Sequence, residues 1–437
     1  MSFIPPLYLV LPFVALLLMI ASGPIFFPHF WEKNYPIISI ILGLLVASHY
    51  ILYYNDTHSP YHALQEYLSF ILLLAVLFTV TGGIFINLQL SPTPLNNALF
   101  LLAGAVLSNF IGTTGASMLL IRPFIKINSN KLRPYHIIFF IFIVSNISGA
   151  LTPIGDPPLF LGFLRGVPFF WVLKNVFFIW LPTIFLVLLV FYFLDRKHSK
   201  RFEDDMRGMP FKLNLQGSSN FLFLGLIILC VFIDPSVFSF VPKITFMPLG
   251  IRELLFIVIA FSAYKLSRPA VRELNEFNFM PIKEVAYLFF GIFFTMIPAL
   301  QLVSHEAAVY RESLDQNTFY WATGTASAFL DNAPTYLNFL SAAMGKYALD
   351  INVIGDVRQF VSEDTIYLQA ISVAAVFFGA MTYIGNGPNF MVKSISERSG
   401  IKMPGFFEYI YKYSIPVLLP LFAVIWFVFF YWAPGKF

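Results

Sequence analysis

Two aspartates lie inside long apolar stretches of this 437-residue sequence, Asp156 in the first half and Asp331 in the second. A charged side chain near the centre of a bilayer costs at least ~2.5–3.5 kcal/mol, so an ionisable residue at that depth is a functional candidate. The alternative is a carboxylate neutralised by a fixed basic partner, but the nearest basic residues, Arg122 and Arg165, stand at the ends of apolar segments. We therefore predict that Asp156 and Asp331 couple proton and ion movement.

Burial disfavours the charged form of a carboxylate. This property suits a group that must exchange a proton for a cation near neutral pH. Hard cations also prefer carboxylate, hydroxyl and carbonyl oxygen. We predict a Na⁺ site at Asp156, Asp331, Thr152 and Asn332. Further candidate ligands for the ion or substrate are Asn109, Thr113, Thr114, Thr335, Thr382, Asn386 and Asn389.

Each of these Thr and Asn side chains has an alternative role. It could instead form a hydrogen bond with a backbone group that the helix interruption leaves unpaired. Thr152 and Thr382 are the stronger candidates, since they occupy equivalent positions in a duplicated motif. Gly155 belongs to the set more as a residue that shapes the backbone than as a direct ligand.

The duplicated motif is a twelve-residue stretch that occurs at 149–160 and again at 379–390, without a gap. Both copies lie inside apolar segments that would otherwise form unbroken helices, but Gly and Pro interrupt them. Non-helical backbone at membrane depth is tolerated only where it lines a cavity or is buried in protein. Two interrupted helices at corresponding positions in two halves indicate the binding site of a transporter.

The composition requires a membrane protein, because 58% of the residues are hydrophobic, 11% are charged and the mean hydropathy is +0.76. Soluble domains carry about 25% charged residues. The fold class that we predict is an all-α polytopic membrane protein whose partner is the lipid bilayer. The sequence has no basic patch with interleaved aromatics for nucleic acid. It also has no phosphate-binding Gly-rich motif. We expect no cofactor.

The apolar segments divide the chain into two halves with the same order of elements. Each half has three spans, a re-entrant hairpin, a broken helix and a plain span. The first half, 1–194, has spans at 7–27, 36–54 and 66–88, a hairpin at 95–125, a broken helix at 135–166 and a span at 171–194. A basic loop, 195–219, follows. The second half, 220–437, has spans at 220–240, 248–266 and 282–303, a hairpin at 319–344, a broken helix at 366–395 and a span at 411–433.

Five crossings in each half would insert the halves in opposite directions, which is an inverted repeat. With both termini outside, most Lys and Arg residues fall inside, including those of the 195–219 loop, and Asp and Glu predominate in the outer loops. The positive-inside rule supports this orientation. We expect a multi-pass protein of the bacterial inner (plasma) membrane.

Three motifs resemble a known family. The sequences Thr-Pro-Ile-Gly-Asp at 152–156 and Asp-Asn-Ala-Pro at 331–334 are similar to motifs of the NhaD-type sodium/proton antiporters. The sequence Gly-Asn-Gly-Pro-Asn at 385–389 resembles a signature of the wider ion-transporter superfamily, which includes citrate, dicarboxylate and arsenite carriers. The resemblance implies Na⁺/H⁺ exchange by alternating access, with Na⁺ and H⁺ as the transported ions and a homodimer as the assembly.

Two other functions are compatible with parts of the sequence. A Na⁺- or H⁺-coupled carrier of citrate or a dicarboxylate is the alternative, because helix N-termini at hairpin tips can hold an anion. Two acidic residues at the site would repel such a substrate unless ions neutralised them. An intramembrane aspartyl protease is the third, and the duplication argues against it because it assigns the two aspartates to different kinds of element. We predict that the protein is not an enzyme.

Overall fold

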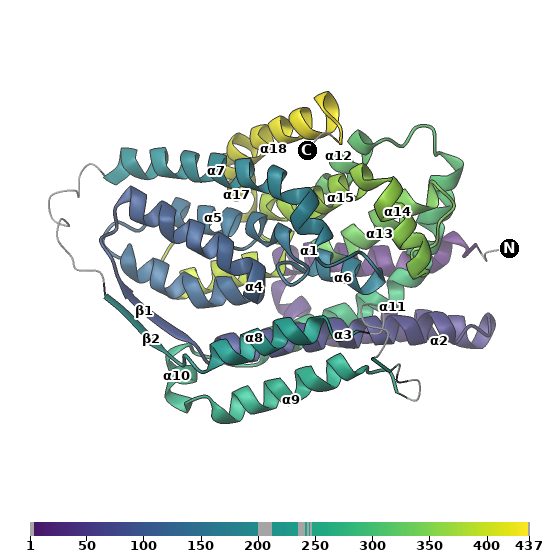
Figure 1. Cartoon of the computed structure of the whole chain (residues 1–437), viewed down its shortest axis with the longest axis horizontal. Coiled ribbons are helices and arrows are strands. Elements are labelled where there is room, and N and C mark those ends of the chain that lie inside the picture. Colours follow the sequence, from purple (N-terminus) through teal and green to yellow (C-terminus); the bar gives the residue numbers. More distant parts are fainter. Residues whose placement is uncertain (1–3, 200–211, 235–240, 243, 245–246, 436–437) are drawn as a thin grey trace.

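The computed structural model describes residues 4–199, 212–234, 241–242, 244 and 247–435. The predicted all-α polytopic membrane architecture is confirmed. Among the described residues, eight helices are long and apolar enough to cross a membrane, or nine if the bent pair of Ile354–Glu363 and Thr365–Met381 counts as one span. Helices account for nearly all the regular structure (Figure 1).

The elements follow the chain in two series. The first comprises η1 (Leu7–Val10), α1 (Leu11–Phe26), α2 (Pro28–Tyr53), α3 (His58–Gly82), β1 (Phe85–Gln89), α4 (Pro94–Ile127), α5 (Pro134–Ile143), η2 (Ile147–Leu151), α6 (Pro157–Arg165) and α7 (Trp171–Ser199). The second begins with β2 (Lys212–Gln216), α8 (Asn220–Val231), α9 (Ile251–Leu266), α10 (Pro269–Leu274) and α11 (Met280–Val309). It continues with α12 (Gln316–Phe329), α13 (Asn332–Gly345), α14 (Ile354–Glu363), α15 (Thr365–Phe378), η3 (Gly379–Met381), α16 (Gly387–Arg398), α17 (Phe406–Tyr409), η4 (Ile410–Leu418), α18 (Leu419–Trp426) and η5 (Phe427–Trp432).

Helix α4 is folded back on itself at Gly112, whose φ of 77° and ψ of 154° are not helical. Glycine suits this position because a Cβ atom disfavours positive φ. The two ends of α4 then meet, since the amides of Asn97 and Asn128 exchange hydrogen bonds of 2.8 and 3.0 Å. The rings of Phe100 and Phe124 also stack, 5.3 Å apart. The chain therefore enters and leaves this hairpin at the same end of the molecule.

Helices α12 and α13 form a second hairpin, which turns at Leu330 and Asp331. The Asp331 carboxylate caps α13 by accepting a hydrogen bond of 3.0 Å from the Ala333 N–H. The far ends of the two helices meet where Lys346 Nζ donates to the Leu314 carbonyl at 2.7 Å. The carboxylate cap satisfies one of the backbone donors that a helix N-terminus leaves unpaired.

The two copies of the duplicated motif form matching breaks between α5 and α6 and between α15 and α16. In the first copy the chain is extended at Thr152 (φ −140°, ψ 154°) and Asp156 (φ −144°, ψ 145°). In the second copy Thr382 (φ −139°, ψ 168°) and Asn386 (φ −155°, ψ 140°) adopt nearly the same conformation. A proline in the first turn then starts each following helix, where its missing N–H costs nothing.

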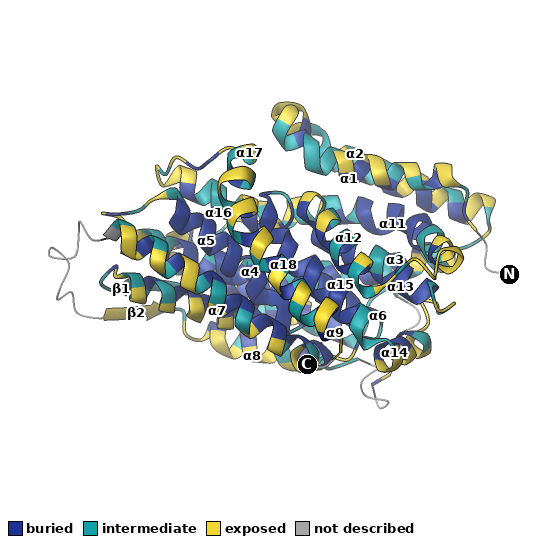
Figure 2. Cartoon of the chain, turned by 90° about the horizontal axis from the view of Figure 1, so that it is seen from above, coloured by how far each residue is buried: buried dark blue, intermediate teal, exposed yellow. Residues whose placement is uncertain are grey.

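Burial separates the breaks from the outer helices (Figure 2). In the segment Pro134–Leu151, 94% of the most apolar window is buried inside the protein, compared with 28% for Leu7–Phe26 and Pro28–Tyr53. The first broken helix thus lies in the core, and α1 and α2 expose apolar side chains, as a lipid-facing helix does.

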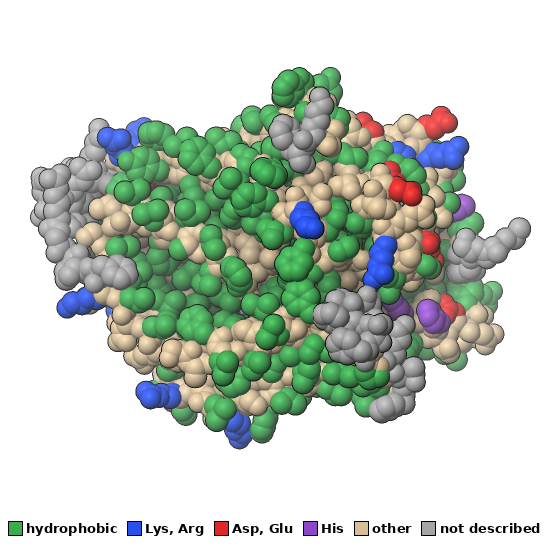
Figure 3. Space-filling model, viewed as in Figure 1, with side chains coloured by type: hydrophobic (Ala, Val, Ile, Leu, Met, Phe, Trp, Pro, Cys, Tyr) green, Lys and Arg blue, Asp and Glu red, His purple; other side chains and the backbone are tan. Residues whose placement is uncertain are grey.

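On the face in Figure 3, Asp and Glu gather near α12 and α14, while the end around β1 and β2 carries Lys and Arg.

Several predicted boundaries were wrong. The span expected at 66–88 begins earlier and ends at Gly82, and β1 follows and pairs with β2, inside the expected 195–219 loop. Residues 86–90 and 212–216 alternate apolar and polar residues, which is the pattern of a strand, and the average hydropathy of the segment concealed it. Helix α7 also continues to Ser199, beyond the expected end at residue 194, and α14 was not predicted. In the span expected at 220–240, α8 ends at Val231, and residues 235–240 lie outside the described residues.

Candidate functional site

Both hairpin tips and both helix breaks meet at one carboxylate, that of Asp156, which is 1% exposed. Its Oδ1 accepts hydrogen bonds from Thr113 Oγ1 at 2.7 Å, in the α4 hairpin, and from Asn386 Nδ2 at 3.1 Å, in the second break. Its Oδ2 accepts a hydrogen bond of 2.6 Å from Asn332 Nδ2, at the tip of the second hairpin. Asp156 itself belongs to the first break.

All three donors to Asp156 are uncharged. Among the described residues, no Lys, Arg or His forms an ion pair with this carboxylate; Arg122 pairs with Glu276 at 3.0 Å, and Arg165 pairs with Glu66. The first turns of α6, α13 and α16 start beside the carboxylate or its donors, so their positive dipole ends favour its negative charge. The site thus presents one negative charge within neutral polar groups, which suits a small cation or a proton.

Thr152 and Thr382 make equivalent contacts. Thr152 Oγ1 donates to the Asn109 carbonyl and Thr382 Oγ1 donates to the Ala328 carbonyl, both at 2.6 Å. Each hydroxyl also accepts from the backbone N–H three residues later, at 3.0 and 3.1 Å. Each hydroxyl therefore connects a helix break to a hairpin tip through backbone groups. This contact corresponds to the alternative role in the sequence analysis, a hydrogen bond to broken helix backbone.

Pairs of glycines allow the extended backbone of each break to fold tightly. A methyl group at Gly155 would lie 2.3 Å from the Gly149 carbonyl oxygen, and one at Gly385 would lie 2.7 Å from that of Gly379. The Gly155 carbonyl also accepts a hydrogen bond of 2.8 Å from the Thr113 N–H. Gly155 consequently shapes the backbone that places Asp156 opposite Thr113.

The other predicted residues lie around this centre and form hydrogen bonds with groups other than the Asp156 carboxylate. Asn109 Oδ1 accepts a hydrogen bond of 3.0 Å from the Leu151 N–H, which joins the first tip to the first break. Thr335 Oγ1 donates to the Asp331 carbonyl at 2.9 Å, and Thr114 is half-buried beside a small cavity. Asp331 is half-buried and caps α13, so the two predicted aspartates have different surroundings.

Asn146 is a site residue that the sequence reasoning missed. Its Nδ2 donates to Asn389 Oδ1 at 2.6 Å, and Asn389 Nδ2 donates in turn to the Gly379 and Thr382 carbonyls at 2.8 and 2.9 Å. The two breaks are thus joined directly. An asparagine within an apolar run, three residues before the duplicated motif, is the signal that could have identified it.

A cavity of about 60 Å³ adjoins Asp156, Thr113 and Thr114. It lies between the first hairpin tip, the first break, α3 at Phe70–Phe78 and the start of α11 at residues 281–285. Pockets for small organic ligands usually hold ~300–1,000 Å³, and a water molecule occupies ~30 Å³. In this conformation the cavity is therefore of the size for an ion with its water.

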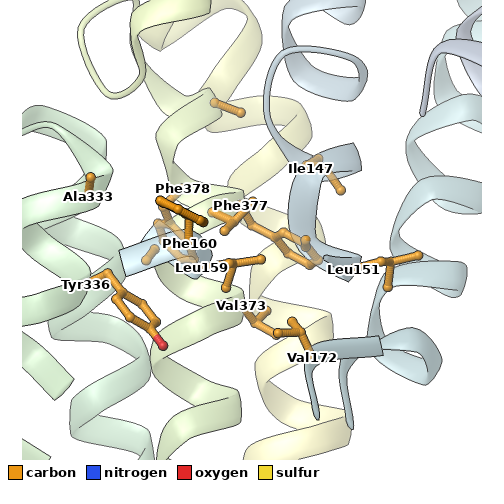
Figure 4. Packing of buried hydrophobic residues seen from close by; sticks show 14 of the residues in the cluster. Ile147, Leu151, Leu159, Phe160, Val172, Ala333, Tyr336, Val373, Phe377 and Phe378 are labelled. Atoms are coloured by element: carbon orange, nitrogen blue, oxygen red, sulfur yellow. The ribbon is translucent and has the colours of Figure 1, made fainter. Parts of the chain in front are cut away.

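An apolar layer around the first break supports the site from the side of α6 and α15 (Figure 4). Phe160, Phe377 and Phe378 are all at most 3% exposed, and Tyr336 of α13 approaches Gly162 of α6 closely. Close packing of this kind leaves little freedom to the elements that carry the polar residues.

A buried ion pair joins α3 to α6. This pair lies nearer the start of α3 than the cavity does. Arg165 Nη2 donates to Glu66 Oε2 at 2.7 Å, and Arg165 Nε lies 2.5 Å from Glu66 Oε1. The guanidinium also donates to Asn352, in the loop before α14. Both charged side chains are at most 8% exposed. This paired contact holds two parts of the molecule together on one side of Asp156.

Comparison with known proteins relates nearly the whole chain to one family. Residues 3–430 match a family described as "Putative citrate transport". No curated protein matches the sequence.

Proposed function

Since the chain belongs to the family described as "Putative citrate transport" and is a membrane transporter, we propose that it exchanges Na⁺ for H⁺ by alternating access. The observation that carries this proposal is the surroundings of Asp156. A fully buried carboxylate receives three neutral hydrogen bonds and, among the described residues, has no ion-pair partner. Its charge is therefore available to a transported cation.

In this mechanism Asp156 is either protonated or balanced by Na⁺. One negative charge cannot favour a proton and a Na⁺ ion at the same time, so binding of one releases the other. The three donors fit the ionised form, because an ionised carboxylate only accepts hydrogen bonds. Asp331, at the second hairpin tip, is the second coupling residue of the proposal.

The proposal includes an inverted repeat of the halves 1–194 and 220–437, with both termini outside the inner membrane of a bacterium. The matched breaks, the matched threonine contacts and the two hairpins support it. Each hairpin returns to the end at which it began, so the hairpins do not count as crossings. A homodimer is the proposed assembly, by resemblance to the superfamily.

Alternating access requires the hairpins and broken helices to move as a unit against the remaining spans. The Glu66–Arg165 pair joins the broken helix to a span on one side of Asp156. The cavity lies on the other side, toward the start of α11, which the proposed topology places inside. We propose that this arrangement is the inward-facing state, in which the ion pair closes the outer side.

A designed disulfide tests this movement. A methyl group at Gly115, in α4, would lie 3.2 Å from Thr81 Cγ2, in α3. This separation is close to that between the Cβ and the far sulfur of a disulfide, so Thr81→Cys with Gly115→Cys should cross-link upon oxidation. In a Cys230→Ala background, oxidation should stop exchange and reduction should restore it. Unchanged exchange in a fully cross-linked sample would contradict the moving-unit mechanism.

The second candidate is a cation-coupled carrier of citrate, which the family description favours. The helix N-termini at the breaks could hold a carboxylate group. Against it, the described contacts of Asp156 include no Lys or Arg to bind an anion, and the adjoining cavity is small.

Transport in proteoliposomes distinguishes the two candidates. Vesicles containing a pH-sensitive dye are diluted into NaCl, KCl or sodium citrate. The antiporter proposal predicts that added Na⁺ makes the lumen alkaline, that K⁺ does so much less, and that radiolabelled citrate does not accumulate. Robust citrate uptake without Na⁺-driven proton movement would refute the antiporter proposal and support the carrier function.

A further inference from the structure

Four basic residues lie in or beside the connection from α9 to α11. They are Lys265 on α9, Arg268 directly before α10, Arg272 on α10 and Lys283 on α11, and they are named the α10 basic cluster. Arg272 is half-buried, and the other three are exposed. Figure 3 shows Lys and Arg side chains near α10 and the adjoining end of α9.

The charges of this cluster are not neutralised by the protein. In the part of the chain that the structure describes, none of the four residues forms an ion pair. Other basic residues that the proposed topology places on the same side differ, since Arg122, Lys131 and Lys393 each pair with a carboxylate at 3.0–3.1 Å. The positive-inside rule accounts for cations on this side of the membrane, but not for four that gather without partners.

The acidic residues of the same stretch compensate the cluster only in part. Glu276 pairs with Arg122 at 3.0 Å. Glu284 interacts electrostatically with Glu32, at the start of α2, and so lies toward a different element. Glu273, exposed on α10, is the remaining carboxylate of residues 261–284. Four positive charges thus stand against one negative charge.

Aromatic rings fix the position of Arg272 in the cluster. Its guanidinium carbon lies 3.9 Å from the centre of the Tyr264 ring, and its Nη1 donates to the Tyr264 carbonyl oxygen at 2.5 Å. The Tyr264 ring lies 5.7 Å from that of Phe279, and Lys283 follows Phe279 by one helical turn. The guanidinium is therefore held between the ends of α9 and α11, with further N–H groups for an anion.

Exposed apolar side chains stand directly beside the basic ones. Leu266, next to Lys265, is 71% exposed, and Met280, one turn before Lys283, is 63% exposed. They mark the places where α9 and α11 meet the connection between them. Apolar side chains next to Lys and Arg at the end of a span are typical of the level of the lipid headgroups.

We propose that the α10 basic cluster binds the headgroup of an anionic phospholipid. The planar fork of an arginine matches the oxygens of a phosphodiester, and the neighbouring cations add attraction. Leu266 and Met280 lie where the acyl chains of that lipid would contact the protein. A free phosphate ion would use the same cations but gain nothing from these apolar side chains. The proposal does not depend on which ion the protein transports.

Lipid binding to the purified full-length protein tests the cluster. Native mass spectrometry during titration with phosphatidylglycerol gives the affinity, and phosphatidylcholine is the lipid without net charge. Arg268→Gln combined with Arg272→Gln removes two of the four charges. At about fivefold for each cation near an anionic lipid, we expect this double variant to bind phosphatidylglycerol about 25-fold more weakly.

The matched control is Arg398→Gln combined with Lys402→Gln, which removes two exposed cations near the end of α16, on the same side of the proposed topology. It should bind phosphatidylglycerol as the unmodified protein does. Lys265→Gln combined with Lys283→Gln leaves the contact of Arg272 with Tyr264 intact. This variant should weaken binding to a similar extent as the arginine variant, and it serves if the arginine variant does not fold.

Three results would overturn the proposal. They are equal affinity of the unmodified protein for the two lipids, phosphatidylglycerol binding of unmodified strength in a folded cluster variant, and an equal loss in the control variant. Displacement of phosphatidylglycerol by millimolar inorganic phosphate would also overturn it, in favour of a site for the free anion. Since the measurement involves no transport, failure of the antiporter proposal would leave this one standing.

Discussion

Asp156→Asn separates the charge of the site from its shape. The variant keeps one side-chain oxygen and replaces the other with an NH₂ group. In the unmodified protein, hydrogen-bond donors face both of these positions. If the NH₂ group takes the place of Oδ2, it faces Asn332 Nδ2 alone. The Asn332 amide can then turn over and accept with Oδ1, which has no donor among the described residues. Thr113 and Asn386 retain their acceptor at the remaining oxygen.

The structure therefore predicts a small effect on folding and a large effect on transport. At most one hydrogen bond is weakened, which costs about 1 kcal/mol. Removal of a unit charge about 4 Å from a cation loses about 4 kcal/mol of attraction at an effective dielectric constant of about 20. At 1.4 kcal/mol per tenfold change, this corresponds to roughly a 1,000-fold loss of cation affinity.

The assay is Na⁺-driven alkalinisation of proteoliposomes, with thermal unfolding in detergent as the measure of folding. We expect exchange to disappear in Asp156→Asn at a nearly unchanged unfolding temperature. Glu363→Gln, the same change of charge to amide in a residue whose carboxylate accepts from exposed Gln359 on α14, should leave exchange intact. Exchange at the unmodified rate in a folded Asp156→Asn variant would refute the carboxylate as the coupling group.

Four further outcomes are expected. Asp331→Asn should fold well because Asn is also a good N-cap residue, yet abolish Na⁺-driven proton movement; retained exchange would limit Asp331 to its capping role. Gly155→Ala should destabilise the protein by more than 1 kcal/mol in thermal unfolding, because its methyl group would overlap a backbone carbonyl oxygen. Glu66→Gln should weaken the buried pair with Arg165 by up to about 3–5 kcal/mol and increase outside labelling of cysteines near the first tip, and unchanged labelling would exclude an outer gate there. Cysteines introduced in the 195–219 loop should react only with reagents applied from the cytoplasm, whereas outside labelling would reverse the proposed orientation.

Much of the architecture could be predicted from local sequence. Composition alone requires many apolar helices, and the duplicated Gly- and Pro-containing stretch indicates where they break. Gly112 stands at a tip because only a residue without a Cβ readily adopts its positive φ. The β1–β2 pair was missed for a local reason as well, since its short alternating segments adjoin longer apolar ones. The helix breaks and the tip depend on neighbours within one or two turns of chain, whereas the strand pair joins residues 85–89 to residues 212–216.

The tertiary structure decided which polar residues act together. The donors to Asp156 lie 43, 176 and 230 positions away in the chain, at Thr113, Asn332 and Asn386. The sequence identifies all three as candidate ligands, but it favours Thr152 and Asp331 over Thr113 and Asn386 for Na⁺, and it gives no prediction for Asn146. Local spacing determines that a polar residue occupies a break or a tip. Which atoms then face one another depends on how four separate elements pack. This packing brings Thr152 to a backbone carbonyl of the first tip, places Asp331 at the cap of α13 and surrounds Asp156 with donors from three other elements.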